Sequence, residues 1–170
     1  MTLIGEWTTV DKTGWGPGPW NGEPDKIHWI DEATDLDCLM HRGPGGHWCG
    51  YVAVAEGHPF FEMAYDELPL PKDEDGYKTY IDVHGGLTFA SFCHEGDDPS
   101  RGICHVPQPG RPDRVWWFGF DCAHSQDLSP AMVARERAYG WSSLGEVYRD
   151  RAYVESEVRG LARQLAAVSP

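Results

Sequence analysis

The most constraining feature of the sequence is an apolar run that ends abruptly in polar residues. Residues 115–121 read Val-Trp-Trp-Phe-Gly-Phe-Asp, and a cysteine, a histidine and a second aspartate follow by residue 127. A strand that is apolar on both faces must be covered on both faces, so we expect a buried strand, central in its sheet. Side chains alternate along a strand, so Trp117, Gly119 and Asp121 share one face. The missing side chain at Gly119 then leaves room for a ligand or a crossing backbone.

Length and composition indicate one globular domain spanning residues 1–170. The chain is long enough to bury its own core, and its 41% hydrophobic residues exclude general disorder. It lacks an apolar run of about 18 residues and a basic start followed by an apolar segment, so we expect a cytoplasmic protein without a membrane partner. Its five cysteines form an odd set in a chain that needs no staples. This predicts reduced thiols.

The net charge of −13 lies almost entirely in the first 100 residues. These contain 5 basic and 19 acidic residues, whereas residues 101–170 contain 9 arginines and 8 acids. Nonspecific binding of nucleic acid requires a basic face, so direct nucleic-acid binding is not expected. An acidic surface can instead block a protein partner, although acidity more often serves solubility.

Turn residues and periodicity predict strands first and helices last. The segment 1–36 is rich in aromatic residues, Gly and Pro, and its loop 13–22 is either anchored by two tryptophans or forms a lid over a site. Residues 79–93 are expected to form two short strands bent at a glycine pair. Further strands are expected at 6–11, 26–30, 37–42 (or a short helix there), 48–55 and 115–121, with 37–55 forming a hairpin.

The C-terminal part, residues 129–168, is predicted to be helical. Ser129 is a candidate N-cap with Pro130 at the first helical position, and Asp150 begins a second helix. In that second helix, apolar residues recur at spacings of three and four, which is typical of a helix that covers a sheet. The fold class expected is therefore α+β: a single domain with a largely antiparallel sheet covered by C-terminal helices.

Two stretches combine polar side chains with neighbouring glycines. Asp82 and His84 precede a glycine pair, and Asp121 and His124 follow the apolar run. Tryptophan and tyrosine rings stack on nucleobases, and a buried carboxylate accepts hydrogen bonds from ring N–H or ribose hydroxyl groups. The alternative is that these aromatic residues are core, which is the commoner role of any single tryptophan at strand spacing. The predicted ligand-binding residues are Tyr51, Asp82, His84, Gly85, Gly86, Trp117, Asp121 and His124, with Arg149 or Arg151 adding charge.

Catalysis and metal binding are alternatives for the same stretches. In a hydrolase, His84 would act as general base, with Asp121 or His124 assisting, although the chain contains no nucleophile elbow and no phosphate-binding loop. No cofactor is favoured, and zinc is the alternative. None of the cysteine and histidine spacings matches an established zinc motif, and adjacent Cys-His pairs on a strand point to opposite faces. The metal candidates are Cys122, His124, Cys104 and His105.

The order of several motifs resembles a family of small uncharacterised proteins encoded by tailed bacteriophages and prophages. The resemblance spans roughly residues 38–168, and the motifs are Cys49-Gly-Tyr-Val, Gly57-His-Pro, Asp82-Val-His-Gly-Gly-Leu-Thr, Trp116-Trp-Phe-Gly-Phe-Asp-Cys-Ala-His with Asp127, and Tyr148-Arg-Asp. It implies a protein that acts in the cytoplasm of an infected bacterial host. It implies no particular activity.

The leading hypothesis is a phage-type protein that binds or sequesters a nucleotide-like ligand, such as a host immune signal, with binding favoured over catalysis. This rests on analogy with small phage proteins that antagonise host defence. The first alternative is a hydrolase acting on a small nucleotide-like substrate, with zinc as its metal. The second is an acidic protein that blocks a host protein by surface contact.

Overall fold

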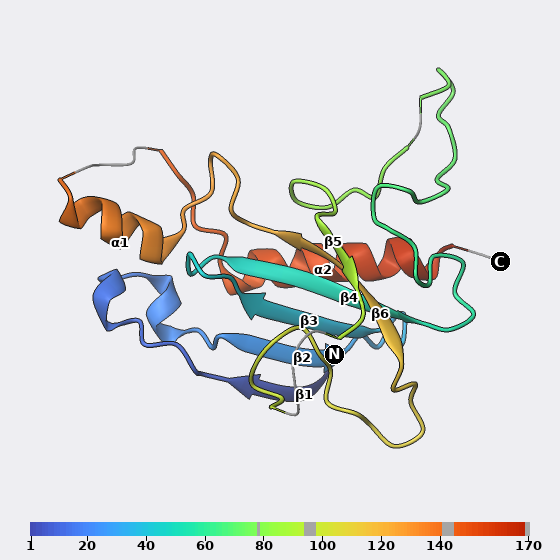
Figure 1. Ribbon diagram of the computed structural model, residues 1–170, viewed down its shortest axis with the longest axis horizontal. Coiled ribbons are helices and arrows are strands. Elements are labelled where there is room, and N and C mark those ends of the chain that lie inside the picture. Colours follow the sequence, from blue (N-terminus) through green and yellow to red (C-terminus); the bar gives the residue numbers. More distant parts are fainter. Residues whose placement is uncertain (78, 94–97, 141–144, 169–170) are drawn as a thin grey trace.

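The computed structural model describes residues 1–77, 79–93, 98–140 and 145–168, and its centre is a six-stranded sheet (Figure 1). Every neighbouring pair of strands is antiparallel, which confirms the expected antiparallel sheet and gives an α+β fold. The order across the sheet is β1-β2-β3-β4-β6-β5. The strands are β1 (Thr2–Trp7), β2 (Lys26–Ile30), β3 (Asp37–Arg42), β4 (Trp48–Ala55), β5 (Phe89–Ser91) and β6 (Val115–Asp121).

Four of the predicted strands occur with the predicted bounds, namely β2, β3, β4 and β6, and the β3–β4 hairpin is present. The strand expected at residues 6–11 lies earlier in the chain, because β1 spans residues 2–7. The prediction for residues 79–93 is half wrong, because residues 79–83 form no strand and only the three residues of β5 pair with β6. β6 is also not central. It lies between β4 and the short edge strand β5.

One face of the sheet packs against helix α2 (Arg151–Ala166), which lies behind the strands in Figure 1. Val154, Val158 and Leu161 of α2 are fully buried in the same apolar cluster as Val52 and Phe118 of the sheet. The helix begins where the sequence predicts, because the Asp150 side chain accepts a hydrogen bond from the backbone N–H of Tyr153. Helix α1 (Pro130–Ala138) lies apart from the sheet, beside the 3-10 turn Thr13–Trp15.

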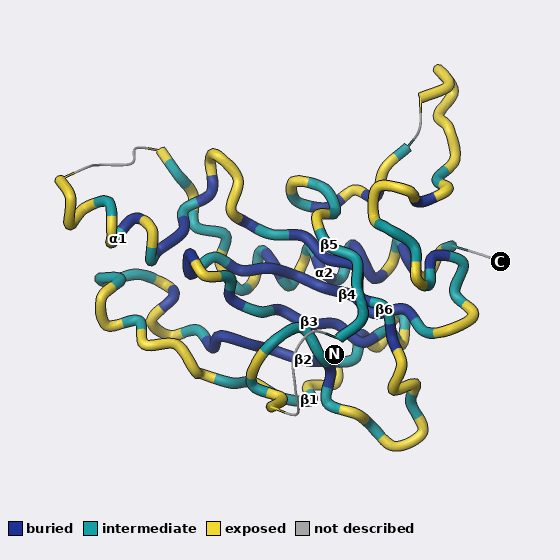
Figure 2. The backbone as a smooth tube through the Cα atoms, viewed as in Figure 1, coloured by how far each residue is buried: buried dark blue, intermediate teal, exposed yellow. Residues whose placement is uncertain are grey.

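The opposite face of the sheet is covered by a chain segment without helix or strand, residues 98–113. Leu39, Tyr51 and Trp117 point to this face and are buried. Lys26 Nζ, also buried, donates hydrogen bonds to the carbonyl oxygens of Arg101 (3.0 Å) and Cys104 (2.9 Å). Strands β2, β3, β4 and β6 are accordingly buried along most of their length, whereas the edge strands β1 and β5 are not (Figure 2). Both faces of β6 are thus covered, as its apolar sequence requires.

The N-terminal segment is anchored by the buried side chain of Arg42. Its guanidinium donates to Asp25 Oδ1 (2.9 Å), to Glu23 Oε2 (2.8 Å) and to the Tyr148 hydroxyl (3.0 Å), and it stacks over the Trp48 ring at 4.2 Å. The same glutamate accepts from the backbone N–H at the start of α2. Arg42 therefore ties the N-terminal segment to the residues that precede α2.

No helix within the described residues is long and apolar enough to cross a membrane.

Candidate functional site

Two histidines, an aspartate and an arginine meet beside the C-terminal end of β6. His84 Nε2 lies 2.7 Å from Asp127 Oδ2, and His124 Nδ1 lies 3.3 Å from the same oxygen. Arg149 Nε donates to the other carboxylate oxygen, Oδ1, at 2.9 Å. The His84 and His124 rings meet edge to face, with their centroids 5.3 Å apart. Three residues from separate parts of the chain, His84, His124 and Arg149, therefore surround the Asp127 carboxylate.

Helix α2 and the loop after β6 position these side chains. The backbone N–H of His84 donates to Glu157 Oε2 at 2.8 Å, and its ring Nδ1 lies 2.9 Å from the Tyr153 hydroxyl, so α2 holds both the backbone and the ring. A parallel bridge between Asp127 and Val147 brings Arg149 alongside the aspartate. Each part of the site is thus supported by hydrogen bonds from a neighbouring element.

Gly85 lets the His84 turn approach the His124 ring. A Cβ atom at Gly85 would lie 2.0 Å from His124 Cε1, and the residue has a φ of +66°, in the left-handed region. Glycine is therefore required here both for the backbone conformation and for the space beside the imidazole. We expect the glycines after His84 to admit a ligand, but the space at Gly85 is occupied by the His124 ring.

Asp127 is held as a carboxylate. Burial acts to raise its pKa, but hydrogen bonds from Arg149 and His84 and from the His124 backbone outweigh burial and lower the pKa to about 2. The exposed fraction of the side chain is 2% for Asp127 and 39% for His124, so the site is buried at the carboxylate and open at one imidazole. His124 and Asp127 line a hollow of about 210 Å³ together with Ala123, Ser125, Ser129, Met132, Val133, Glu136 and Glu146.

The donor atoms fit a divalent metal ion. One nitrogen of His84, one of His124 and one oxygen of Asp127 all lie within 4.8 Å of one another. In a tetrahedral zinc site with bonds of about 2.0–2.1 Å, neighbouring N and O ligands are about 3.3 Å apart. The His124–Asp127 separation of 3.3 Å already meets this value, whereas the His84–Asp127 pair, at 2.7 Å, would open by about half an ångström. The Tyr153 hydroxyl on the other nitrogen of His84 is the outer hydrogen bond that orients a metal-bound imidazole.

The aromatic part of the predicted ligand site lies elsewhere. Tyr51 and Trp117 are buried on the face covered by residues 98–113, while His84 contacts α2 on the opposite face. The gap predicted at Gly119 is also filled, because a Cβ there would lie 2.2 Å from the ring of Tyr51, its partner across β4 and β6. Neighbouring residues of a strand point to opposite faces of the sheet. Trp117 therefore lies in the core of one face, while His84 lies against α2 on the other. The predicted arrangement of an aromatic platform beside His84 is therefore wrong.

Asp121 and Asp82 stand apart from the cluster. Asp121 accepts hydrogen bonds from the Thr88 hydroxyl (3.0 Å) and the Ala123 backbone N–H (3.1 Å), so it caps the turn after β6. Asp82 pairs through its backbone with the Gln164 amide and lines a different hollow, of about 500 Å³, along α2. Gly86 has open space around it. Of the predicted ligand residues, His84, Gly85 and His124 come together.

Asp127, Arg149 and Tyr153 complete the site, and the sequence does not predict their contacts with His84. Asp127 belongs to a motif and Arg149 is a predicted source of charge, but no sequence pattern pairs either with His84. The available signal was the helical start after Asp150, which places Tyr153 and Glu157 on one face of α2, one turn apart. A contact between residue 84 and that face depends on tertiary packing. No local pattern shows it.

The cysteines differ from the prediction of five reduced thiols. Cys93 and Cys104 are joined by a disulfide, whereas Cys38, Cys49 and Cys122 are free and buried. Burial raises the pKa of the Cys122 thiol well above its ordinary value, and the thiol belongs to the core rather than to the His124 site. Adjacent Cys and His residues would point to opposite faces of a strand, but Cys104 and His105 do not lie in a strand. Their ligand atoms therefore lie close to each other and to Cys93. His94, the neighbour of Cys93, lies outside the described residues.

Comparisons of the chain with protein-family models, with curated proteins and with solved structures find no significant match. The resemblance to phage-encoded proteins therefore stays a prediction, and the functional argument rests on the site alone.

Proposed function

We propose that the chain is a metal-dependent hydrolase of a small substrate, with a divalent cation held by His84, His124 and Asp127. The observation that carries the proposal is the convergence of three ligand atoms within 4.8 Å, next to a hollow of about 210 Å³. Two imidazoles and one carboxylate form a common donor set of catalytic metal sites, in which a fourth position stays open for water or substrate. The partly exposed His124 places that position toward the hollow.

The surrounding residues support this assignment. A bound cation would polarise a substrate oxygen and acidify a bound water molecule. Arg149 donates to Oδ1 of Asp127, so Oδ2, which also accepts from the His124 backbone N–H at 3.1 Å, would be the single donor atom to the cation. Glu136 and Glu146 line the hollow, so its charge favours a cation, and a carboxylate at this position can accept a proton from an attacking water.

Binding of a nucleotide-like ligand without turnover stays a second prediction for the same hollow. Arg149 is the group that would attract a phosphate, but it is already paired with Asp127. The rings of Tyr51 and Trp117 are buried on the other face of the sheet and offer no stacking surface there. The acidic lining disfavours a free anion. Hydrolysis assisted by a cation is therefore the better supported function.

Hydrolysis of chromogenic nitrophenyl esters and phosphodiesters tests the proposal, with Zn²⁺ or Mn²⁺ added to chelator-treated protein. We expect turnover that requires the metal and falls at least about 100-fold in His84→Ala and Asp127→Asn, because each removes one ligand. His58→Gln and Asp66→Asn are the matched controls. His58 contacts the Leu165 carbonyl, and Asp66 is exposed.

Metal content measured on the same samples gives an independent readout. Without reductant, which keeps the Cys93–Cys104 disulfide intact, wild type and both controls should retain one equivalent of metal, and the two ligand variants should lose it. Metal retained by His84→Ala and Asp127→Asn would contradict the proposed ligands. Stoichiometric metal without turnover of any ester or phosphodiester would keep the site and contradict the hydrolase.

A further inference from the structure

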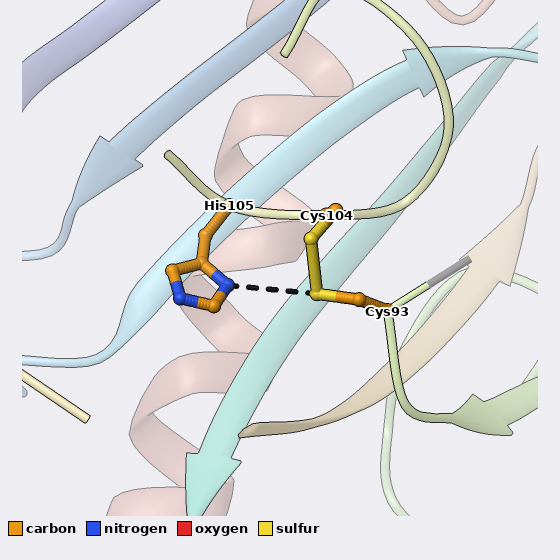
Figure 3. A group of neighbouring side chains, drawn as sticks. All are labelled: Cys93, Cys104 and His105. Carbon is orange, nitrogen blue, oxygen red and sulfur yellow. Dashed lines mark hydrogen bonds between the residues drawn. A yellow bond between two sulfur atoms is a disulfide. The ribbon is translucent and has the colours of Figure 1, made fainter. Parts of the chain in front are cut away.

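A second group of potential metal ligands lies on the opposite face of the sheet, away from the His84 site. Figure 3 shows Cys93, which follows β5, next to Cys104 and His105 from the segment that covers this face. His105 Nδ1 points at Cys93 Sγ, 3.6 Å away, and the ligand atoms of the three residues all lie within 4.8 Å of one another. His105 is buried, while both cysteines are partly exposed.

We propose that Cys93, Cys104 and His105 bind Zn²⁺ when the disulfide is reduced. In a tetrahedral site with Zn–S bonds of about 2.3 Å and Zn–N bonds of about 2.0–2.1 Å, the nitrogen and sulfur ligands are about 3.6 Å apart. The His105 Nδ1–Cys93 Sγ distance of 3.6 Å has this value already. The two sulfur atoms would separate to about 3.8 Å once their bond is broken. A Cys₂His set leaves the fourth position for water or substrate.

The other nitrogen of His105 supports the role of its ring as a ligand. Among the described residues, His105 Nε2 is buried without a hydrogen-bond partner, and it lies 3.5 Å from Asp113 Oδ1. A carboxylate behind the second ring nitrogen is the usual outer partner of a zinc-bound histidine, and it selects the tautomer whose Nδ1 faces the metal. The contact is slightly too long for a hydrogen bond in the disulfide form and would shorten on metal binding.

Charge balance favours zinc at this position. Lys26 is already buried on this face and donates to the Cys104 carbonyl, so an additional net positive charge would be costly. Two thiolates neutralise one Zn²⁺, and the site as a whole then carries no net charge. The soft sulfur ligands also favour zinc over magnesium or calcium.

The two states interconvert by a balanced thiol–disulfide exchange. A dithiol reductant attacks the Cys93–Cys104 bond and leaves as a disulfide, which delivers two electrons and two protons to the two sulfur atoms. Binding of Zn²⁺ then releases both thiol protons. Zinc and the disulfide are mutually exclusive, so the redox state of this cysteine pair decides whether the covering segment 98–113 is held to β5 by a covalent bond or by a metal.

Titration with Co²⁺ under anaerobic conditions tests the proposal, because thiolate-to-cobalt charge transfer gives a near-ultraviolet band that sulfur-free sites lack. Reduced wild type should develop the band with one equivalent of Co²⁺, and Zn²⁺ should abolish it. The oxidised protein should show no band. Cys104→Ser should lose it, His105→Gln should bind at least about tenfold more weakly, and Asp113→Asn should bind about tenfold more weakly.

Two controls separate this site from the others. Cys38→Ser removes a free buried thiol and should leave the band unchanged. His84→Ala should also leave it unchanged, because that residue belongs to the sulfur-free site, so either site can fail without the other. A reduced wild type that binds no Co²⁺ through sulfur, or a band that persists in Cys104→Ser, would overturn the proposal. Near-ultraviolet circular dichroism of the tryptophans verifies that each variant is folded.

Discussion

Gly85 and Gly86 provide a matched pair of substitutions that probes the His84 site. Both residues have a positive φ, +66° and +84°, so alanine at either position should cost about 1–2 kcal/mol in the free energy of unfolding. Only at Gly85 does the new Cβ meet another group, because it would lie 2.0 Å from Cε1 and 2.7 Å from Nδ1 of His124, whereas nothing lies within 4 Å at Gly86. To restore ordinary contact, the His124 ring must withdraw by about 1.4 Å.

A displacement of that size moves a ligand atom out of bonding distance of the cation. Misplacement of a functional group by about 1 Å can cost about 100-fold in rate, and loss of one ligand weakens metal binding by at least about tenfold. Chemical denaturation and zinc titration against a chromogenic chelator, both without reductant, should therefore separate the two variants. Gly86→Ala should be less stable with metal affinity within about threefold of wild type, and Gly85→Ala should also lose at least about tenfold in affinity. Equal affinities for the two variants would refute the assigned role of His124.

Three further predictions concern stability. Arg42→Met should lower the free energy of unfolding by about 3–5 kcal/mol, because it removes the cation paired with Glu23 and leaves Asp25 with Lys12 alone. Arg101→Met, at an exposed side chain, should cost less than about 0.5 kcal/mol in the same urea titration, and similar losses for the two variants would contradict the anchoring role. Burial lowers the pKa of Lys26 from 10.5 to about 8, so between these pH values the unfolded chain binds one proton more than the folded chain. The free energy of unfolding should therefore rise with pH in this range, by on the order of 3 kcal/mol relative to Lys26→Met. Parallel curves of stability against pH for the two proteins would contradict this. Asp150→Ala should lower the free energy of unfolding by about 1 kcal/mol, measured by thermal unfolding, and Ser129→Ala should lower it by clearly less. Of these two N-cap residues, only Asp150 makes a side-chain hydrogen bond to the helix. A larger loss for Ser129→Ala would show that the caps are misassigned.

The strands and helices that the sequence predicts correctly are those with strong local patterns. β4 and β6 are β-branched and aromatic runs bounded by turns, and α2 has apolar residues at helical spacing after a capping aspartate, so each pattern identifies its own element. Residues 79–83 carry a similar alternation yet pair with no strand, because Asp82 forms its backbone hydrogen bonds with the Gln164 side chain of α2. Such a partner is a property of tertiary packing.

For the candidate site too, local sequence patterns predict some features correctly and tertiary contacts decide the others. His84 stands out because it precedes a glycine pair, and His124 because it follows an apolar run, and the structure brings these two rings together. Trp117 is predicted to join the site because it shares a strand face with Gly119 and Asp121, yet that face is the one that residues 98–113 cover. The Cys93–Cys104 disulfide contradicts the prediction of reduced thiols, because that prediction rests only on the cysteine count and the chain length. Contacts between residues distant in sequence decided each of these outcomes.

The most direct test of the metal site is anomalous X-ray diffraction from crystals of the oxidised protein grown with Zn²⁺ and measured on both sides of the zinc absorption edge. The account predicts one anomalous peak about 2.0–2.2 Å from Nε2 of His84, Nδ1 of His124 and Oδ2 of Asp127, with the His84–Asp127 separation lengthened from 2.7 Å. A map without a peak among these three atoms, with His84 still hydrogen bonded to Asp127, would contradict it.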